Sequence, residues 1–377
     1  MINDNKHIDW YILLSVSTLM LFSIAFVYSA SATFAAEKFG SYEKLFWDHL
    51  IRVLIGIVIM IFVAKIDYHH WRKVSKLGVI IAIGLLIAVL VAGISAKGAS
   101  RWLDLGPMRF QPSEFAKIAL VIHLSVLITR KQHVIRDFQK GMLPILIWTG
   151  SIALLVFLQP NLSTTLVIIF IAIAMMFVGN TNIWHISLVS VISFVLAGIM
   201  VVIKSDYRMN RIMAFFGNPE KANDLESVSY QLQQSLIAFG NGGILGKGPG
   251  LSRQSDLFLP ESYGDFIFSI VGEEYGFIGT TLIICLFGLI FWRGMIVAKN
   301  APDDFGYYLS IGIIVTICLS VVVNAGVNTG ILPTTGLPMP FISYGGTAVF
   351  FQSASIGILL NISSQSGVFS RSKTILK

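Results

Sequence analysis

Residues 77–95 read LGVIIAIGLLIAVLVAGIS, nineteen positions without a charged side chain. A helix needs about 20 apolar residues to cross roughly 30 Å of hydrocarbon, so this stretch is long enough to span a membrane. Backbone groups inside lipid must find hydrogen-bond partners within the protein, which favours a helix over an isolated strand. The stretch therefore predicts a transmembrane helix.

The composition extends this prediction to the whole chain. Of the 377 residues, 55% are hydrophobic and 12% are charged, whereas a soluble domain has about 25% charged residues. The mean hydropathy is +0.77. Intrinsic disorder would require low hydrophobicity, and a disulfide-stapled scaffold would require more than the two cysteines present. The expected fold class is an all-α polytopic membrane protein.

About ten stretches have the length and hydropathy of membrane spans. No cleavable signal peptide is expected before the first of them. We predict one integral membrane domain over residues 1–377, with an outer loop at 204–265 and helices near 10–31, 50–66, 77–95, 113–129, 142–158, 162–179, 184–203, 273–297, 305–327 and 345–363.

The net charge of +7 is interpreted as membrane topology. With ten spans, basic clusters such as Arg72–Lys76 and Arg130–Lys140, and the tail with Arg371, Lys373 and Lys377, fall on one side. The positive-inside rule makes that side cytoplasmic and places both termini there. Because no basic cluster is interleaved with aromatic residues, no nucleic-acid partner is expected.

Two segments on the opposite, outer side are unusual. The loop at 204–265 contains many apolar residues, which predicts short amphipathic helices on the membrane surface. The uncharged stretch 332–346 is rich in Pro and Gly. Irregular backbone near a membrane is tolerated where it is buried in protein or lines a cavity. We therefore expect an outer vestibule suited to an amphiphilic ligand.

Common catalytic motifs are absent: there is no H-E-x-x-H and no Cys/His cluster with metal-ligand spacing. Gly246-Lys247-Gly248 lacks the other residues of a phosphate-binding P-loop. The surrounding residues 240–250 contain many glycines, whose amides could approach an anion with help from Lys247 and Arg253. The alternative, a flexible joint between two surface helices, is favoured by the residues alone.

Ionisable residues at membrane depth are stronger functional candidates. Glu114 and Lys117 lie three residues apart on one helical face, so they could pair with each other or line a cavity. Asp265 lies where the outer loop re-enters the membrane and could be a general base, an N-cap, or both. Glu273 and Glu274 are expected to make interior hydrogen bonds.

Several ordered strings match a known family. They include VYSAS (27–31), RWL (101–103), QPSEFAK (111–117), DFIF (265–268), GEE (272–274) and LPTTGLPMPFISYGG (332–346). Together they resemble the SEDS family (shape, elongation, division and sporulation) along the whole chain. Within it, the sequence is more similar to the division branch, FtsW, than to the elongation branch, RodA.

The resemblance implies a ten-span protein of the bacterial inner membrane. It also implies a peptidoglycan glycosyltransferase that polymerises lipid II with a class B penicillin-binding protein and other division proteins. The family's catalytic aspartate matches Asp265, which would act as general base in an inverting displacement. A divalent cation, Mg²⁺ or Mn²⁺, could assist, although no metal ligands are assigned. The candidates for substrate binding are Arg101, Glu114, Lys117, Arg109, Lys247, Gln231, Gln234 and Ser343.

The sequence departs from the family pattern at three positions. Asn161 replaces an acidic residue, Ser255 replaces a lysine, and Gly264 replaces a hydroxyl residue before Asp265. We therefore give position 161 no catalytic role. Two other functions stay open: a flippase that moves the same lipid, and a membrane scaffold that recruits division proteins. The lack of an internal repeat argues against the transporter.

Overall fold

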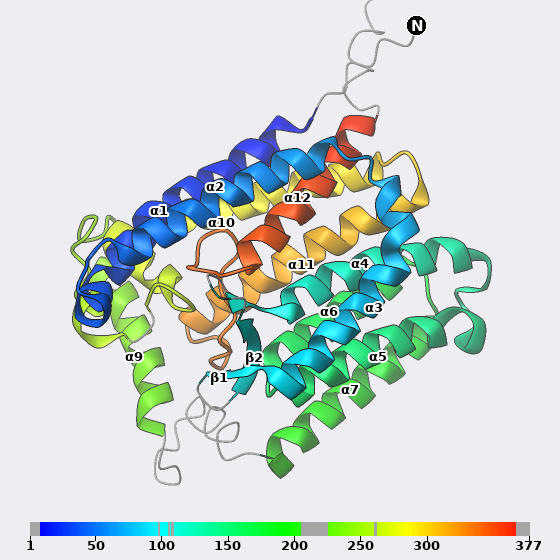
Figure 1. Ribbon diagram of the computed structural model, residues 1–377, viewed down its shortest axis with the longest axis horizontal. Helices are drawn as coiled ribbons and strands as arrows, with labels where there is room; N and C mark the ends of the chain where they lie inside the picture. Colours follow the sequence, from blue (N-terminus) through cyan, green and yellow to red (C-terminus); the bar gives the residue numbers. More distant parts are fainter. Residues whose placement is uncertain are drawn as a thin grey trace, which may run out of the picture.

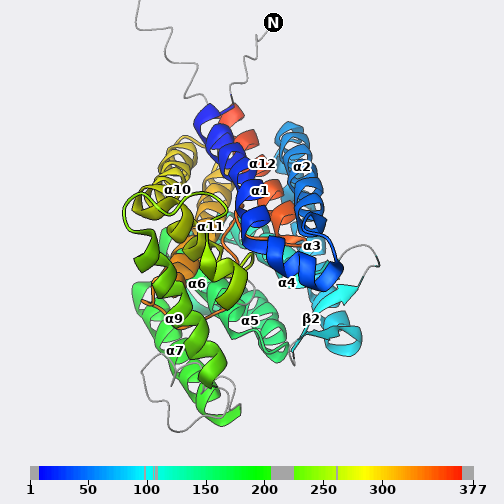
Figure 2. The same ribbon diagram turned by 90° about the vertical axis from the view of Figure 1, so that its left-hand side faces the viewer.

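A computed structural model describes residues 8–96, 99–104, 106, 109–204, 225–259 and 262–366. As predicted, it is mainly a bundle of long helices (Figures 1 and 2). Residues 77–92 of the apolar stretch 77–95 form most of α3. Each predicted span is largely covered by a helix: α1 (Trp10–Phe39), α2 (Lys44–Lys65), α3 (His69–Ala92), α4 (Pro112–Lys131), α5 (Leu143–Leu158), α6 (Leu162–Val178), α7 (Ile183–Lys204), α10 (Ile267–Lys299), α11 (Asp304–Asn328) and α12 (Ala348–Gln365).

Several helix boundaries differ from those expected. Helix α1 continues to Phe39, and Gly40 ends it in the left-handed conformation with a φ of 70°. Helix α10 begins at Ile267, ahead of the expected 273. Hydropathy detects only the part of a helix that lies in hydrocarbon, so polar ends that extend the same helix are missed.

Seven helices of the described chain are long and apolar enough to cross a membrane, namely α1, α2, α3, α4 with the following 3-10 turn η1 (Gln132–Val134), α5 with the preceding π turn η2 (Phe138–Met142), α10 and α11. Apolar segments at Leu162–Val178 and Ile183–Ser193 are shorter. The chain is therefore a multi-pass membrane protein, and the count of ten spans stays a prediction.

A small antiparallel sheet was not predicted. It consists of β1 (Ile94–Ala96), β2 (Ala99–Asp104) and β3 (Arg109–Phe110), in the order β1-β2-β3. Leu103 pairs with Phe110, and Asp104 pairs with Arg109. The expected third span, 77–95, was thus too long at its end, because residues 94 and 95 belong to this sheet. The sheet carries Arg101 and Arg109.

The outer loop contains α9 (Leu225–Gly242) and the π turn η4 (Gln254–Phe258). Helix α9 runs across the direction of α10 at one end of the bundle (Figures 1 and 2). Its inner face packs on α10 through Phe239 and Phe268, whose ring centroids are 5.7 Å apart, while Leu236 and Ile237 are exposed. The loop therefore contains a helix, as predicted, and the position of this helix on a membrane surface stays a prediction. Part of the predicted loop, 205–224, lies outside the described residues.

The two ends of the described chain meet at the opposite end of the bundle, which we call the inner end. The Asp9 amide donates to Ser363 Oγ over 3.1 Å, and the buried Asp9 carboxylate pairs with Arg293 Nη2 at 2.8 Å. The first and last described residues therefore lie at the same end of the bundle, and the membrane orientation of the termini stays a prediction. The basic residues of the tail, Arg371, Lys373 and Lys377, lie outside the described residues.

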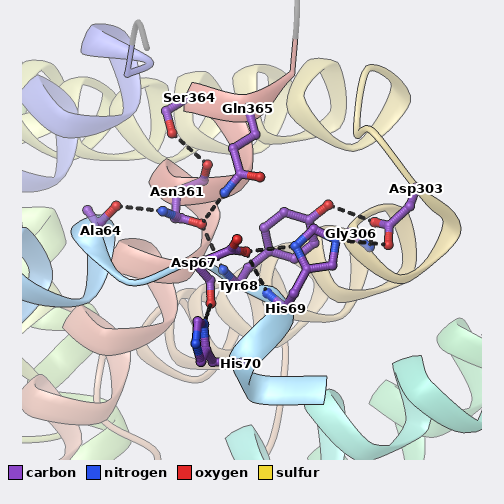
Figure 3. A network of polar contacts seen from close by, with 10 residues as sticks. All are labelled: Ala64, Asp67, Tyr68, His69, His70, Asp303, Gly306, Asn361, Ser364 and Gln365. Carbon is purple, nitrogen blue, oxygen red and sulfur yellow. Dashed lines mark hydrogen bonds and ion pairs between the residues drawn. The ribbon is translucent and has the colours of Figure 1, made fainter. Parts of the chain in front are cut away.

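A second polar network also ties the inner end together (Figure 3). Tyr68 Oη donates to Asp303 Oδ1 over 2.8 Å, and His69 lies between Asp67 Oδ1 at 2.7 Å and Asp303 Oδ2 at 3.4 Å. Asn361 accepts from the Tyr68 amide and donates to the Ala64 carbonyl. The turns after α2 and α10 are thereby joined to α12, far from the outer loop.

Candidate functional site

Asp265 lies in the turn of residues 262–266 that leads into α10, and it is half-buried. The N-cap of α10 is Phe266, so the alternative role of Asp265 as the N-cap is wrong. Ser262 Oγ donates to the Ala30 carbonyl over 2.7 Å and ties the turn to α1. Beneath the turn, Phe266 and Ile270 belong to a buried apolar cluster. The carboxylate is therefore attached to a well-anchored turn.

The irregular segment 329–347, which joins α11 to α12, brings distant parts of the chain to Asp265. A Cβ added at Gly336 would lie 3.3 Å from Asp265 Oδ2, and the Tyr344 amide donates to the Tyr263 carbonyl over 2.9 Å. The Thr335 carbonyl accepts from Ser163 Oγ at the start of α6 over 2.9 Å. The irregular stretch singled out in the sequence thus forms one wall beside Asp265.

The same segment reaches the Glu114–Lys117 pair. Glu114 Oε1 and Lys117 Nζ are 2.8 Å apart, and both side chains are about 95% buried. The predicted pairing within one helix is confirmed. Both residues also line a cavity with Pro340 of the irregular segment and with polar side chains of α11 and α12, namely Thr316, Ser320, Gln352 and Ser355. The cavity has a volume of about 20 Å³, enough for about one water molecule, so the ion pair is confirmed and the ligand-binding role of Lys117 stays a prediction.

The two arginines of the small sheet lie at the edge of this region. An Arg101 Nη2–H group donates to the Pro160 carbonyl, which places Arg101 at the α5–α6 turn. Arg109 is exposed, and a Cβ added at Gly346 would lie 3.3 Å from its carbonyl oxygen. The Gln111 amide donates to Thr347 Oγ1 over 3.1 Å. The sheet therefore packs against the irregular segment and brings two cations to the site's periphery.

The glycine-rich stretch 240–250 packs against a break in α10. Gly276 interrupts α10 with a φ of 65°, and the stretch supplies hydrogen bonds around this break. Lys247 N and Gly248 N donate to the carbonyls of Glu273 and Glu274, each over 2.9 Å. A Cβ at Gly246 would lie 2.1 Å from the Glu274 carbonyl oxygen. The glycines are needed for close backbone approach.

Glu273 explains the position of Lys247. Its side chain is fully buried, and its Oε1 lies 3.1 Å from Lys247 Nζ. Oε1 also accepts from Asn241 Nδ2, while Oε2 accepts from Ser252 Oγ over 2.6 Å and from the Gln254 amide over 3.1 Å. Lys247 therefore serves a structural ion pair, which weakens its assignment to substrate. The interior role expected for Glu273 is confirmed.

The other predicted substrate-binding residues are dispersed. Ser343 is buried, and its Oγ accepts from the Met339 amide over 2.8 Å, so it stabilises a turn of the irregular segment. Gln231 and Gln234 are half-buried on α9. Within the described chain neither amide has a side-chain hydrogen bond that would fix it toward Asp265. These residues stay predictions.

Tyr344 is surrounded by residues that the sequence did not single out. The Arg52 guanidinium lies 4.6 Å from the Tyr344 ring centroid, and the Tyr263 ring centroid lies 5.5 Å away at nearly right angles. Burial raises the pKa of the Tyr344 phenol above its usual value, although Arg52 opposes the shift. An arginine two residues inside the expected span 50–66 was the available signal.

Two asparagines of α11 were also missed. Asn324 and Asn328 are buried and are spaced by one helical turn. Amide side chains inside an apolar helix were the signal, since buried polar groups require partners. In the part of the chain that the structure describes, no group of three or more His, Cys, Asp or Glu residues could hold a metal ion.

Comparison with known proteins gives a consistent result. The family model described as "Cell cycle protein" matches residues 9–367. Stage V sporulation protein E of Bacillus subtilis is 39% identical over 357 residues, covering 93% of this chain and 96% of that protein. A probable peptidoglycan glycosyltransferase FtsW of Trichlorobacter lovleyi is 39% identical, covering 94% and 93%.

Solved structures share the fold. A chain of a peptidoglycan synthase complex, described as coordinating polymerization and crosslinking, has a TM-score of 0.76 at 24% identity and covers 95% of this chain and 98% of that chain. The rod shape determining protein RodA of Thermus thermophilus has a TM-score of 0.71 at 22% identity and covers 95% and 97%.

Proposed function

Because the chain belongs to the cell cycle protein family of FtsW, RodA and SpoVE, we propose that it polymerises lipid II into β-1,4 glycan strands during cell division. It is a peptidoglycan glycosyltransferase, the activity named for its FtsW relatives. The observation that carries the assignment to a site is the half-buried Asp265 on an anchored turn, bordered by the irregular segment 329–347.

The proposed reaction is a single inverting displacement. The 4-hydroxyl of one sugar attacks C1 of the other, the C1–oxygen bond to the lipid pyrophosphate breaks, and Asp265 takes the hydroxyl proton. General-base assistance contributes roughly 10²–10⁴-fold. No covalent enzyme intermediate is needed, because one displacement converts an α-linked donor into a β-linked product.

The departing pyrophosphate requires positive charge. Arg109 is exposed at the edge of the site, and Arg101 reaches the α5–α6 turn. Lys117 lines the cavity, although its ammonium already pairs with Glu114. We assign Arg101 and Arg109 to the pyrophosphate ahead of Lys117, and we omit Lys247 because Glu273 engages it. Arginine suits phosphate because its fork of donors can bind two oxygens.

The test is glycan-strand formation by the purified protein from lipid II, with Asp265→Asn beside the unaltered protein. The variant keeps the size of the side chain but cannot accept a proton at neutral pH. We expect loss of roughly 10²-fold or more of the polymerisation rate. An Asp265→Asn protein with an unchanged melting temperature and near-normal polymerisation would refute the assignment.

The partner and location follow from the same family membership. We include in the proposal a class B penicillin-binding protein that crosslinks the product, and a bacterial inner membrane with both termini in the cytoplasm. The contact between Asp9 and Ser363 supports termini on one side. Co-purification with the transpeptidase tests the partner. Labelling of single cysteines placed at Gly40 and His70, at opposite ends of α1–α3, tests the orientation.

A further inference from the structure

Two side-chain amides of α11 converge on the backbone of Asp265. Asn324 Nδ2 donates to the Asp265 carbonyl over 2.8 Å, and Asn328 Nδ2 donates to the same oxygen over 3.0 Å. Asn324 is 1% exposed and Asn328 is fully buried. The spacing of four residues places both amides on one face of the helix. The geometry is a two-point clamp on one carbonyl.

The clamped oxygen lies outside the hydrogen-bond ladder of α10. The first backbone acceptor of that helix is the Phe266 carbonyl, which receives the amides of Ser269 and Ile270. Carbonyls that are shielded from water are nearly always hydrogen-bonded, and the bonds to this one are partly buried, so a donor is expected here. One donor would meet that need. The second fixes the direction of the peptide group and therefore of the Asp265 Cα–Cβ bond.

Each asparagine also holds a second wall of the site. The other N–H of Asn324 donates to the Leu337 carbonyl over 2.8 Å, and Leu337 follows Gly336, the residue that borders Asp265 Oδ2. Asn324 therefore sets the spacing between the carboxylate and the irregular segment. A shift of this segment alone would change the room available beside the carboxylate.

Asn328 connects the clamp to the outer loop. Its Oδ1 accepts from the Ser269 amide in the first turn of α10 over 3.1 Å, and its carbonyl accepts from Ser235 Oγ of α9 over 2.8 Å. Asn328 Nδ2 also donates to the Asn324 carbonyl over 2.9 Å. The two asparagines thus hold α9, α10 and the irregular segment in one arrangement around Asp265.

We infer that Asn324 and Asn328 are positioning residues for the Asp265 carboxylate, acting through its peptide carbonyl. The inference rests on the proposed function, because it needs Asp265 to be the base. A misplacement of about 1 Å in a catalytic group can cost on the order of 10²-fold in rate. The clamp touches no substrate, so its loss acts on the chemical step and leaves substrate binding nearly unchanged.

The test compares Asn324→Ala with a matched control in the full-length protein and its partner. Asn361 is also buried, 5% exposed, and also makes two backbone hydrogen bonds, to Tyr68 and Ala64, but at the inner end. Asn361→Ala should therefore lose a similar amount of thermal stability. Melting temperature, kcat and KM for lipid II polymerisation are measured for both variants and for Asp265→Asn.

We expect Asn324→Ala to lower kcat on the order of 10²-fold with KM little changed, while Asn361→Ala keeps kcat. Asn328→Ala keeps the Asn324 hydrogen bonds to both the Asp265 and the Leu337 carbonyls, whereas Asn324→Ala loses both, so Asn328→Ala should show a smaller fall in kcat. If Asn324→Ala does not fold, the kcat of Asn328→Ala alone tests the positioning role of the asparagines. Equal kcat in the asparagine variants and the Asn361 control, with an inactive Asp265→Asn, would overturn the clamp only. An active Asp265→Asn would overturn the proposed base itself.

Discussion

Replacing Glu273 by alanine should release the glycine-rich stretch 240–250 from α10. The Glu273 carboxylate is fully buried and accepts hydrogen bonds from Asn241, Lys247, Ser252 and the Gln254 amide. Alanine removes all of them at once. The backbone hydrogen bonds from Lys247 and Gly248 to α10 would remain, but without the side chain that draws the stretch against the helix.

The magnitude follows from the partners that are left behind. Removing one member of a buried ion pair costs about 3–5 kcal/mol. The Lys247 side chain is 34% exposed and can regain water, so the cost falls at the lower end, about 3 kcal/mol. At roughly 2 °C per kcal/mol for a large chain, the melting temperature should fall by ~6 °C. Glu273→Gln should lower the melting temperature by less than Glu273→Ala, because the amide oxygen can still accept on one side whereas the amide nitrogen cannot accept the hydrogen bonds of the other side.

Hydrogen exchange provides the assay. The amides of Lys247 and Gly248, and those of Phe277 and Ile278 that donate to Gly243 and Ile244, should exchange faster in Glu273→Ala. The exposed Glu37 provides a control, and Glu37→Ala should leave exchange and melting temperature unchanged. Unaltered protection of these four amides in Glu273→Ala, with an unaltered melting temperature, would refute the structural role of the carboxylate.

Three further outcomes are expected. Lys117→Ala leaves the buried Glu114 without its cation and should lower the free energy of unfolding by about 3–5 kcal/mol. The double variant Glu114→Leu, Lys117→Met should restore the melting temperature but not lipid II polymerisation. Recovery of both would show that the pair is purely structural. Gly276→Ala, whose Cβ would lie 2.4 Å from Gly246 N at a φ of 65°, should lower folded yield and melting temperature, whereas Gly288→Ala, with nothing within 4 Å, should change neither. Burial alone would raise the pKa of the Asp67 carboxyl, but hydrogen bonds from His69 outweigh burial and lower it below 3.8. The ionised carboxylate therefore stabilises the folded protein above the unfolded-state pKa, and this stabilisation is lost as the pH falls through the lowered folded-state pKa. The melting temperature should fall between about pH 6 and about pH 3, and it should fall less in Asp67→Asn.

Hydropathy predicted the bundle because lipid imposes one requirement on every span. Nearly uncharged stretches of about 20 residues have few alternatives to a transmembrane helix. The same criterion failed at the ends of helices, where α1 continues to Phe39. It also missed the sheet of residues 94–110, because β2 pairs with its neighbours through backbone groups and the segments are short.

The glycine-rich stretch shows what a pattern in one segment cannot reveal. Dense glycines are typical of both anion-binding loops and joints. Their actual partner is the broken turn of α10 near Gly276, about thirty residues later in the chain. Both features are visible in the sequence, namely the glycine-rich stretch and a glycine, Gly276, inside an apolar span. The backbone hydrogen bonds between residues 243–248 and 273–278, together with the Glu273 carboxylate, join them in the folded chain.

The contacts also separate the acidic residues that the sequence could only group together. Glu273 Oε1 accepts from Lys247 in the glycine-rich stretch, and its Oε2 accepts from Ser252 just after it. Glu274 accepts from Ser29 Oγ in the bundle interior, and Glu114 pairs with Lys117. Each of these three glutamate residues is at most 4% exposed. A general base must reach a substrate hydroxyl within about 3 Å. Asp265 is half-buried and lies close to Gly336. Of the acids that the sequence singled out, it is therefore the one that is not fully buried, as the proposed base requires.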